Sequence, residues 1–300
     1  MEYNCVDKGG EKCPCVLMEA GQCYICTMSR TGRCSCGQQW KGLCPYNEFV
    51  QNGGKPSGIL KEFAAPVLKI TDYSEHLKVV RLKVPAGFAQ KCQSAGSYIM
   101  VNSLGYKVPL SVLCSTVFSG EGSSEGYIEL AIQPAGPKTL ELFRPDNECW
   151  IISGPFAAGL VNVESLDYTK PVLVVAKGTA AAPYINIRSR IEGRIFVDTD
   201  KLTDGFIEEY LGDKLYKKVS LQNDMEKIMK EIDTAGPAEQ IMFLASPYYT
   251  EKILQMRPGR INDIIIPNHA NICCGVGICG ACSYTDKDGV TVRRCKITER

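Results

Sequence analysis

Apolar and polar residues alternate in short runs between residues 58 and 165. Such runs occur at Pro66–Ile70, Leu77–Val84 and Tyr127–Ile132, and glycine, proline and serine separate them. A period of two is typical of strands with one buried face, and frequent turn residues favour antiparallel connections. Residues 58–165 are therefore predicted to form a small antiparallel β-barrel.

The pattern changes between residues 166 and 262, where continuous apolar runs alternate with segments of helical periodicity. Helices are predicted after the first strand, near Asp204–Leu211 and over Asn223–Ile232. The predicted strands are Pro171–Ala176, Arg194–Asp198, a segment near Lys217–Leu221, and Gln240–Ala245. Alternation of strands and helices predicts a Rossmann-like α/β domain with a parallel sheet.

Four cysteines near the C-terminal end have the spacing C-x4-C-x2-C-x12-C. They are Cys274, Cys279, Cys282 and Cys295, and glycines surround the first three. Small residues let the backbone fold closely around a bulky cluster, so this spacing favours a 2Fe-2S cluster in a domain of residues 263–300. Structural zinc also takes four thiolates, but it usually uses two C-x2-C pairs. A chain with such a cluster is predicted to transfer electrons.

Eight further cysteines lie within the first 44 residues, and their spacing repeats. Each half reads C-x7-C-x-C-x7-C. A repeat this short has too few apolar residues for its own core, so bound metal would supply the folding free energy. Two four-cysteine sites are predicted in residues 1–57, with the ligands Cys5, Cys13, Cys15, Cys23, Cys26, Cys34, Cys36 and Cys44. The spacing leaves open whether each site uses one repeat or both.

The identity of this N-terminal metal is open between iron–sulfur clusters, including 4Fe-4S, and zinc. C-x-C pairs occur in structural zinc sites. Iron–sulfur is favoured because a second redox group in the same chain would make a relay useful, whereas zinc would only stabilise a docking surface. A glycine-rich linker is expected over 52–58.

The remaining cysteines and the two histidines receive no metal. Cys273 would change the loop spacing to C-x5-C, so it is interpreted as a spare thiol. The isolated cysteines Cys92, Cys114 and Cys149 are expected to pack as small apolar side chains. His76 and His269 belong to no nucleophile or metal pattern, and no catalytic residue is assigned.

The overall charge limits the classes of partner. A net charge of +1 gives no basic surface for nucleic acid. No apolar run reaches the about 20 residues that cross a bilayer, and no export signal is visible. We therefore expect a cytoplasmic protein without a membrane anchor, in which reduced thiols bind metal and do not form disulfides.

Three short motifs accompany the order of barrel, α/β domain and cysteine loop. They are Val108–Val112 with the sequence VPLSV, Gly136–Thr139 with GPKT, and Gly154–Gly159 with GPFAAG. On these motifs and the cysteine loop, residues 60–300 resemble the ferredoxin-reductase-like flavoproteins. Within them the chain is similar to the electron-transfer subunit of dihydroorotate dehydrogenase and to the small subunit of NADH-dependent ferredoxin:NADP oxidoreductase. The N-terminal cysteine module is an addition to that common core.

The resemblance implies FAD as a cofactor. It places the flavin ring against Pro109, Leu110, Ser111 and Val112, where the Ser111 hydroxyl would donate to the ring edge that holds charge on reduction. It places the diphosphate at Gly136, Lys138 and Thr139, where glycine permits close approach of the backbone. An ordinary strand and turn is the structural alternative for each motif.

The chain departs from the family at the loop that binds pyridine nucleotide. The family usually has G-G-x-G-x-A-P, whereas this chain has KGTAAAP over 177–183. Gly178 and Thr179 remain as candidate NAD(P) contacts. Asp198 is a candidate for a ribose hydroxyl, with a structural cap equally plausible. Tyr248 and Tyr249 are candidates for ring stacking, with simple packing as the alternative.

The resemblance also implies that the chain works in a complex. Its partner would be a second redox subunit, either a dehydrogenase or a glutamate-synthase-like flavoprotein, with ferredoxin as a further candidate. The N-terminal module would add a branch to a third partner or belong to an electron-bifurcating assembly. The alternative function is a non-catalytic relay or adaptor, with impaired nucleotide binding and a zinc-stabilised docking module.

Overall fold

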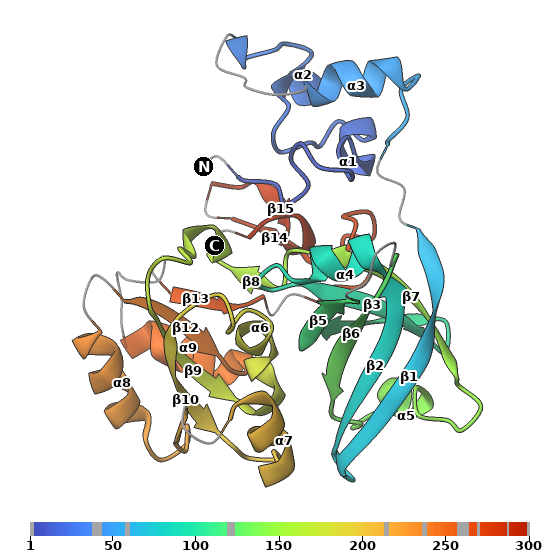
Figure 1. Cartoon of the computed structure of the whole chain (residues 1–300). Coiled ribbons are helices and arrows are strands. Elements are labelled where there is room, and N and C mark those ends of the chain that lie inside the picture. The colour runs from blue at the N-terminus through green and yellow to red at the C-terminus, as the bar shows by residue number, and fades with distance from the viewer. Residues whose placement is uncertain are drawn as a thin grey trace. The chain divides into compact units, whose positions relative to one another are not determined.

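The structure is a computed structural model that describes residues 3–37, 44–57, 61–118, 124–212, 216–235, 239–256, 264–268, 271–286 and 288–298. It divides into two compact units (Figure 1). The first, which we call the cysteine unit, combines Met1–Glu62 with Ala270–Glu299. The second, which we call the sheet unit, contains Phe63–His269. His269 and the last linker residue, Gly58, lie outside the described residues.

The first half of the sheet unit is a seven-stranded sheet with the strand order β4-β3-β7-β1-β2-β6-β5. The pairs β1–β2, β2–β6, β5–β6, β3–β4 and β3–β7 are antiparallel, as the alternating pattern predicts. The elements are β1 (Glu62–Ser74), β2 (Leu77–Pro85), α4 (Ala86–Cys92), β3 (Tyr98–Ser103), β4 (Tyr106–Ser111), β5 (Cys114–Val117), β6 (Glu125–Ile132), α5 (Pro137–Glu141) and β7 (Cys149–Phe156).

Alternation along β2 and β6 accounts for the core of this sheet. Val80 and Leu82 of β2 and Ile128 and Leu130 of β6 are buried in one apolar cluster, which also contains Trp150 of β7. Burying such side chains contributes about 1.5–3 kcal/mol each. The opposite face of β6 carries Glu129, which is also buried.

The second half of the sheet unit is a six-stranded sheet with the order β11-β10-β9-β12-β13-β8. The strands β9 to β13 pair in parallel, and β8 joins antiparallel to β13. The four predicted strands are confirmed within a few residues. The strands are β8 (Leu160–Val161), β9 (Val172–Lys177), β10 (Gly193–Asp198), β11 (Tyr216–Lys218), β12 (Gln240–Leu244) and β13 (Ile264–Pro267).

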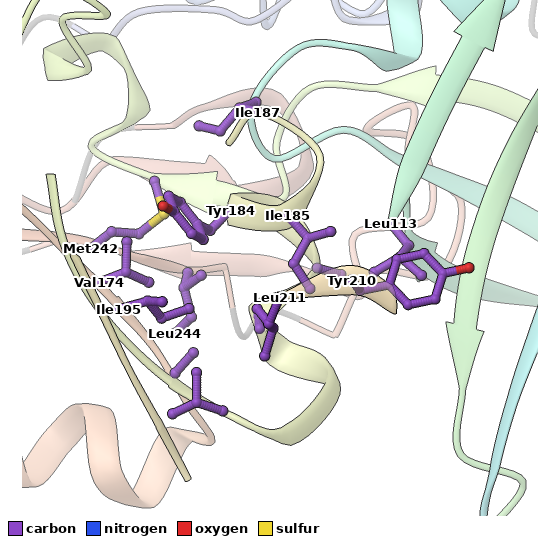
Figure 2. Packing of buried hydrophobic residues seen from close by; sticks show 14 of the residues in the cluster. Leu113, Val174, Tyr184, Ile185, Ile187, Ile195, Tyr210, Leu211, Met242 and Leu244 are labelled. Atoms are coloured by element: carbon purple, nitrogen blue, oxygen red, sulfur yellow. The ribbon is translucent and has the colours of Figure 1, made fainter. Parts of the chain in front are cut away.

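Helices pack on both faces of this sheet, because the side chains of its central strands are apolar on both sides. They are α6 (Ala182–Ile185), α7 (Asp204–Tyr210), α8 (Met225–Thr234) and α9 (Pro247–Met256). Residues of α6 and α7 share one apolar cluster with β9, β10 and β12, whereas α8 and α9 share the cluster on the other face. Figure 2 shows Tyr184 of α6 beside Met242 and Val174, and Tyr210 of α7 beside Leu113, which follows β4. The first cluster thus continues from the α/β sheet into the antiparallel sheet.

The sequence did not predict α9 or β13. Strand β13 hydrogen-bonds to β12, so the residues just before the cysteine loop complete the α/β sheet. Where the sequence predicts a helix after β9, the chain first makes a 3-10 turn at Gly178–Ala181 and then the four-residue helix α6.

The cysteine unit joins both ends of the chain. Its elements are α1 (Val16–Glu19), α2 (Thr27–Thr31), α3 (Pro45–Gln51), β14 (Ser283–Thr285) and β15 (Thr291–Arg293). Cys5 makes an antiparallel bridge with Ile297, and the Val6 N–H donates to the Lys296 carbonyl at 3.0 Å. Tyr3 packs with Val292 and Ile297 in a small core. Among the described residues, no helix combines the length and the apolar character that spanning a bilayer requires.

Candidate functional site

A pocket of about 390 Å³ lies in the sheet unit at the carboxyl ends of β9 and β12. Loops after the parallel strands form one side, and Ser111 and Gln133 from the antiparallel sheet form the other. The lining residues are Ser111, Gln133, Gly159, Lys177, Gly178, Thr179, Ala180, Pro183, Asp200, Lys201, Ala245, Ser246, Pro247 and Pro267. Open α/β sheets place their ligands at this edge, in the crevice beyond the carboxyl ends of the strands.

The candidate flavin motif lies on β4 at the edge of its sheet. Pro109 and Leu110 pair with Met100 and Ile99 of β3, and the next residue, Ser111, reaches the pocket. Val112 follows the strand and is fully buried in the core of the antiparallel sheet. Of the four predicted residues, Ser111 is thus the pocket-lining one.

The turn at Gly136–Thr139 caps the short helix α5. The Thr139 hydroxyl accepts from the N–H groups of Ala135 and Gly136, both at 3.2 Å. The Lys138 carbonyl accepts from the Ser103 hydroxyl at 2.7 Å, and the Lys138 ammonium lies 4.2 Å from the ring centroid of Tyr106. These residues do not line the 390 Å³ pocket. A second hollow, of about 260 Å³, is lined by Ser103 and by residues from the end of α5 onward.

The backbone conformation of the loop at Lys177–Pro183 explains why it has a glycine at position 178. Gly178 has φ +55°, a left-handed conformation that residues with a Cβ adopt only with strain. Ala180 lines the pocket at the position where the flavoproteins that this motif resembles have a glycine, so its methyl group occupies space at the wall. The loop therefore keeps the backbone turn but presents side chains to the pocket.

Lys177 and Asp198 form an ion pair across the ends of β9 and β10, with Nζ and Oδ2 2.9 Å apart. Asp200 lies 3.5 Å from the same ammonium. Burial alone would lower the pKa of Lys177, but the hydrogen bond and charge of Asp198 and the charge of Asp200 raise it. The positive charge of Lys177 is therefore balanced by two of the chain's own carboxylates.

Both carboxylate oxygens of Asp198 are hydrogen-bonded within the fold. Oδ2 accepts from the Leu221 N–H at 2.9 Å, and Oδ1 accepts from the Asp200 N–H at 3.1 Å. Burial alone would raise the pKa of Asp198, but the bonds from Lys177, Leu221 and Asp200 outweigh it and lower the pKa. These contacts are those of a structural cap at the strand end, and a ribose contact would have to share the same oxygens.

Tyr248 and Tyr249 begin α9, next to the pocket-lining residues Ser246 and Pro247. Tyr248 is exposed, and Tyr249 packs against the core with its ring centroid 5.1 Å from that of Tyr248. The Lys177 ammonium lies 5.8 Å from the Tyr249 centroid. Tyr249 therefore has a packing role, whereas the Tyr248 ring is available at the surface.

A polar contact that the sequence did not reveal links the two sheets. Glu129 accepts from Arg81 Nε at 2.8 Å and from the Tyr210 hydroxyl at 3.2 Å, and Arg81 Nη2 lies 2.7 Å from the same carboxylate. Burial and the negative charge of Glu129 raise the pKa of Tyr210. Alternation along β6 places Glu129 on the face opposite the barrel core, but only the fold shows that α7 covers this face.

Cys295 interacts with two of the other three candidate cluster ligands, Cys274 and Cys282. Hydrogen bonds from the Cys295 thiol lower the pKa of Cys274 to about 3 and that of Cys282 to about 6. The same bonds raise the pKa of Cys295, and burial adds to the effect. Cys279 interacts with Cys274, and its burial raises its pKa. The Cys295 N–H donates to the Cys282 sulfur at 3.5 Å.

Peptide N–H groups of the glycine-rich loop also point at these sulfurs. The N–H groups of Val276 and Cys279 donate to Cys274, and that of Ala281 donates to Cys279. Such donors stabilise thiolates and tune the potential of a cluster that the thiolates bind. Cys273 is exposed beside this loop.

The N-terminal cysteines lie at the ends of short elements. Cys15, Cys26 and Cys44 immediately precede α1, α2 and α3. Cys23 and Cys26 are buried together with Met18. The repeated spacing therefore does not produce repeated secondary structure, because α2 follows Cys26 whereas turns follow its counterpart Cys5.

Lys296 and Asp7 form a buried ion pair between the two ends of the chain, with side chains 3% and 10% exposed. Burial alone would lower the pKa of Lys296, but the charges of Asp7, Cys15 and Cys5 raise it. No local sequence pattern predicts this pair. What the sequence does show is that Lys296 directly follows Cys295, a candidate cluster ligand.

Thiolate sulfur is the donor that iron–sulfur clusters and structural zinc both take. Among the described residues, no group of three or more Cys, His, Asp and Glu side chains is arranged to hold a metal ion. Of the isolated cysteines, Cys92 is fully buried in the core of the antiparallel sheet, Cys114 is half-buried and Cys149 is exposed. The packing prediction is thus confirmed for Cys92 and wrong for Cys149, which lies on the outer face of its strand.

No protein-family model and no curated protein sequence matches this chain. Several solved structures have the same fold. The NADH-dependent reduced ferredoxin–NADP oxidoreductase, studied for flavin-based electron bifurcation, has a TM-score of 0.58 at 16% identity, covering 77% of this chain and 85% of that one. Phthalate dioxygenase reductase, described as transferring electrons from pyridine nucleotides to [2Fe-2S], has a TM-score of 0.53 at 12% identity, with 79% and 96% covered.

The ferredoxin reductase of carbazole 1,9a-dioxygenase gives a TM-score of 0.52 at 15% identity over 69% of this chain and 67% of that one. Identities this low establish the fold and leave the chemistry to the residues of this chain. The chain therefore shares the ferredoxin-reductase fold, in which an antiparallel sheet is followed by an α/β sheet.

Proposed function

We propose that this chain is the electron-transfer subunit of a cytoplasmic oxidoreductase complex and uses FAD and iron–sulfur clusters. The observation that carries the proposal is the pocket at the carboxyl ends of β9 and β12, which Ser111 of the antiparallel sheet completes. In this fold such a position suits a redox cofactor between the two sheets. The proteins that share the fold include ferredoxin reductases.

FAD fits the chain in part. Ser111 would orient the flavin ring, with Pro109 and Leu110 beside it and Val112 supporting the strand. Gly136, Lys138 and Thr139 would face the diphosphate, although the Thr139 hydroxyl is already used in its own turn. When bound, a flavin supplies the conversion of two-electron hydride chemistry into one-electron steps.

The C-terminal cysteines would hold the 2Fe-2S cluster. Cys274, Cys279, Cys282 and Cys295 are the four ligands, since their thiols already interact and backbone N–H groups point at the sulfurs. The cluster would supply one-electron transfer to a partner. Exposed Ile278 and Cys279 lie on the loop itself and would face that partner.

NAD(P) contacts would come from Gly178 and Thr179 in the pocket, with Asp198 at the next strand end. Because Asp198 already pairs with the Lys177 ammonium, we expect nucleotide binding to be weak. This ion pair favours the second candidate function, a relay or adaptor subunit that receives electrons only from its partner. That partner would be a dehydrogenase or a glutamate-synthase-like flavoprotein, with ferredoxin as a further acceptor, and an electron-bifurcating assembly is one such arrangement.

An anaerobic absorption spectrum of the purified protein tests the proposal, with flavin, iron, zinc and sulfide quantified. Flavin together with an iron–sulfur band, both bleached by NADH or NADPH, is the expected result. Flavin and cluster that neither nucleotide bleaches would favour the relay. Absence of flavin would refute the proposal.

Two matched variants localise the C-terminal cluster. Cys282→Ala removes a buried thiol that interacts with Cys295 and is expected to abolish the 2Fe-2S signal. Cys149→Ala alters an exposed thiol on β7 and is expected to leave the signal unchanged. An intact signal in Cys282→Ala would show that the loop does not bind the cluster in this way.

A further inference from the structure

The pocket beyond β9 and β12 has walls from both halves of the sheet unit. Ser111 of β4 lies on the antiparallel side, and Thr179 and Pro183 lie on the α/β side. The distance between these walls depends on the contacts that join the two halves. One set of contacts is made by residues 92–97, which run from the end of α4 to the start of β3 and which we call the bridging segment.

The bridging segment is packed into the cores of both halves. Cys92, its first residue, belongs to the core of the antiparallel sheet, whereas Ala95 belongs to the cluster that the α/β sheet shares with α6 and α7. Ile185 and Ile187 lie in this second cluster (Figure 2). Close-packed interiors are not easily compressed, so a displacement of either half would be transmitted through this segment.

Asn186, between these two isoleucines, ties the bridging segment to the α/β half. Its Nδ2 donates to the main-chain carbonyls of Cys92 at 2.8 Å and Ser94 at 3.4 Å. Because both partners are acceptors, the amide must present its nitrogen to them. The Asn186 Oδ1 is buried without a hydrogen-bond partner among the described residues, so the nitrogen alone makes this contact. The Arg190 guanidinium donates to the carbonyl in between, that of Gln93.

The far end of the bridging segment is held against the pocket wall. The Gly159 N–H donates to the Gly96 carbonyl at 3.2 Å. A Cβ on Gly159 would lie 2.2 Å from that oxygen, and a Cβ on Gly96 would lie 2.8 Å from Leu160 Cγ, so this close approach requires glycine at both positions. Gly159 lines the pocket, and its carbonyl accepts from the Asn268 N–H at 2.9 Å.

The same segment positions the strand that carries Ser111. The Ser97 carbonyl accepts from the Val112 N–H at 3.0 Å, and Tyr98 pairs with Ser111 between β3 and β4. Ser97 is itself buried. A displacement of the bridging segment would therefore change the separation of Ser111 from Thr179 on the opposite wall.

We propose that the bridging segment fixes the width of the pocket and that Asn186 and Arg190 are the positioning residues that hold it. The pocket is then formed before any ligand enters. The group that lies at Ser111 keeps a constant distance from the loop at 177–183, which favours transfer reactions because they depend on the orientation of the reacting groups. The inference rests on the proposed function in that a redox cofactor occupies the pocket.

Three variants of the full chain separate positioning from stability. Asn186→Leu has a side chain of similar size that cannot donate to the carbonyls, and Arg190→Met keeps the apolar stem without the guanidinium. Gln240→Met is the matched control. The Gln240 amide also donates to two main-chain carbonyls, those of Asp167 at 2.7 Å and Lys170 at 3.2 Å, but it lies within the α/β half and does not line the pocket.

Hydrogen–deuterium exchange of the full chain, read by mass spectrometry, reports on the bridging segment without any cofactor. In Asn186→Leu, the peptides that contain Val112 and Gly159 are expected to exchange about tenfold faster, because their N–H groups donate to this segment. Gln240→Met is expected to leave both peptides unchanged. Unchanged exchange in Asn186→Leu, or an equal change in Gln240→Met, would overturn the proposal. Arg190 is exposed, so Arg190→Met repeats the test with the core unaltered.

The visible circular dichroism of bound flavin gives a second readout. Asn186→Leu and Arg190→Met are expected to change the flavin bands while the flavin content per chain stays the same, and Gln240→Met is expected to match the unaltered protein. Identical flavin bands in all four proteins would refute the positioning role. Failure of the proposed function would appear instead as absence of flavin from the unaltered protein, where the exchange measurement still decides whether the bridging segment holds the pocket.

Discussion

Substituting the ion pair between Lys296 and Asp7 tests how much the contact between the two ends of the chain stabilises the cysteine unit. The side chains are 3% and 10% exposed, so both charges lie away from water. Removing one partner of a buried pair leaves the other charge uncompensated and costs about 3–5 kcal/mol. Lys296→Met keeps the length of the side chain and removes its charge.

Urea denaturation of the full protein measures this loss of stability. Circular dichroism and the visible absorbance of protein that contains its cofactors follow the unfolding. With a slope of about 1–3 kcal/mol per molar urea, the midpoint for Lys296→Met should fall by at least about 1 M. The double variant Lys296→Met with Asp7→Asn removes both charges and should recover most of the loss. Lys170→Met, in the exposed pair with Asp167, is the control, expected to change stability by at most about 1 kcal/mol.

Two results would refute this reasoning. A midpoint for Lys296→Met within error of the control would mean that the pair is solvated in solution. A double variant as unstable as Lys296→Met would mean that the loss comes from the packing of the lysine chain and not from the unpaired carboxylate of Asp7.

Three further predictions concern the sheet unit. Asp198→Asn removes the nearer of the two carboxylates paired with Lys177, leaving Asp200 at 3.5 Å, and should tighten NADH or NADPH binding about tenfold in a fluorescence titration, whereas weaker binding would indicate a ribose contact. Because the folded pKa of Asp198 is lowered, its contribution to stability is present above the unfolded pKa of about 3.9 and lost as pH falls through the folded value. Unfolding midpoints from pH 7 to 3 should therefore fall less in Asp198→Asn than in the unaltered protein. Glu129→Gln weakens the contacts to Arg81 and Tyr210 and should cost about 1–3 kcal/mol, seen as a lower melting temperature, and an unchanged value would show that the contact does not stabilise the fold.

The strands could be predicted because their signals are local. Alternation at Leu77–Val84 and the apolar run at Pro171–Ala176 each specify burial within a few residues, and the structure has β2 and β9 there. Strand β13 was missed because its apolar residues are few and lie directly before the cysteine loop. Its place in the sheet depends on pairing with β12, which no local pattern encodes.

Residues of the candidate site could be predicted only where a short sequence motif determines the local backbone geometry. Gly178 was a candidate because of its motif, and the structure has a left-handed turn there that lines the pocket. The partners of Lys177 were not found, since Asp198 and Asp200 reach it from the next strand of a parallel sheet. Ion pairs of this kind depend on which strand ends are neighbours, and therefore on the topology.

In the cysteine unit, too, a contact could not be predicted because its residues are far apart in the sequence. Lys296 and Asp7 are 289 positions apart, and the whole sheet unit lies between them in the chain. Sequence separation adds little cost, because each doubling of a loop costs only about 0.6 kcal/mol in closure entropy. The N-terminal module looked like an addition in front of a common core because its repeat is self-contained in spacing.

Contacts with the C-terminal segment show that the N-terminal module is part of the same folded unit. Tyr3 shares an apolar core with Val292 and Ile297, and Cys5 forms a backbone bridge to the segment that follows Cys295. A chain without residues 1–57 would therefore expose Val292 and leave Lys296 without its carboxylate, so the C-terminal loop would lose part of its own fold. The module is thus part of the compact unit that contains the C-terminal cysteines, and the cysteines of both segments should be studied in the full chain.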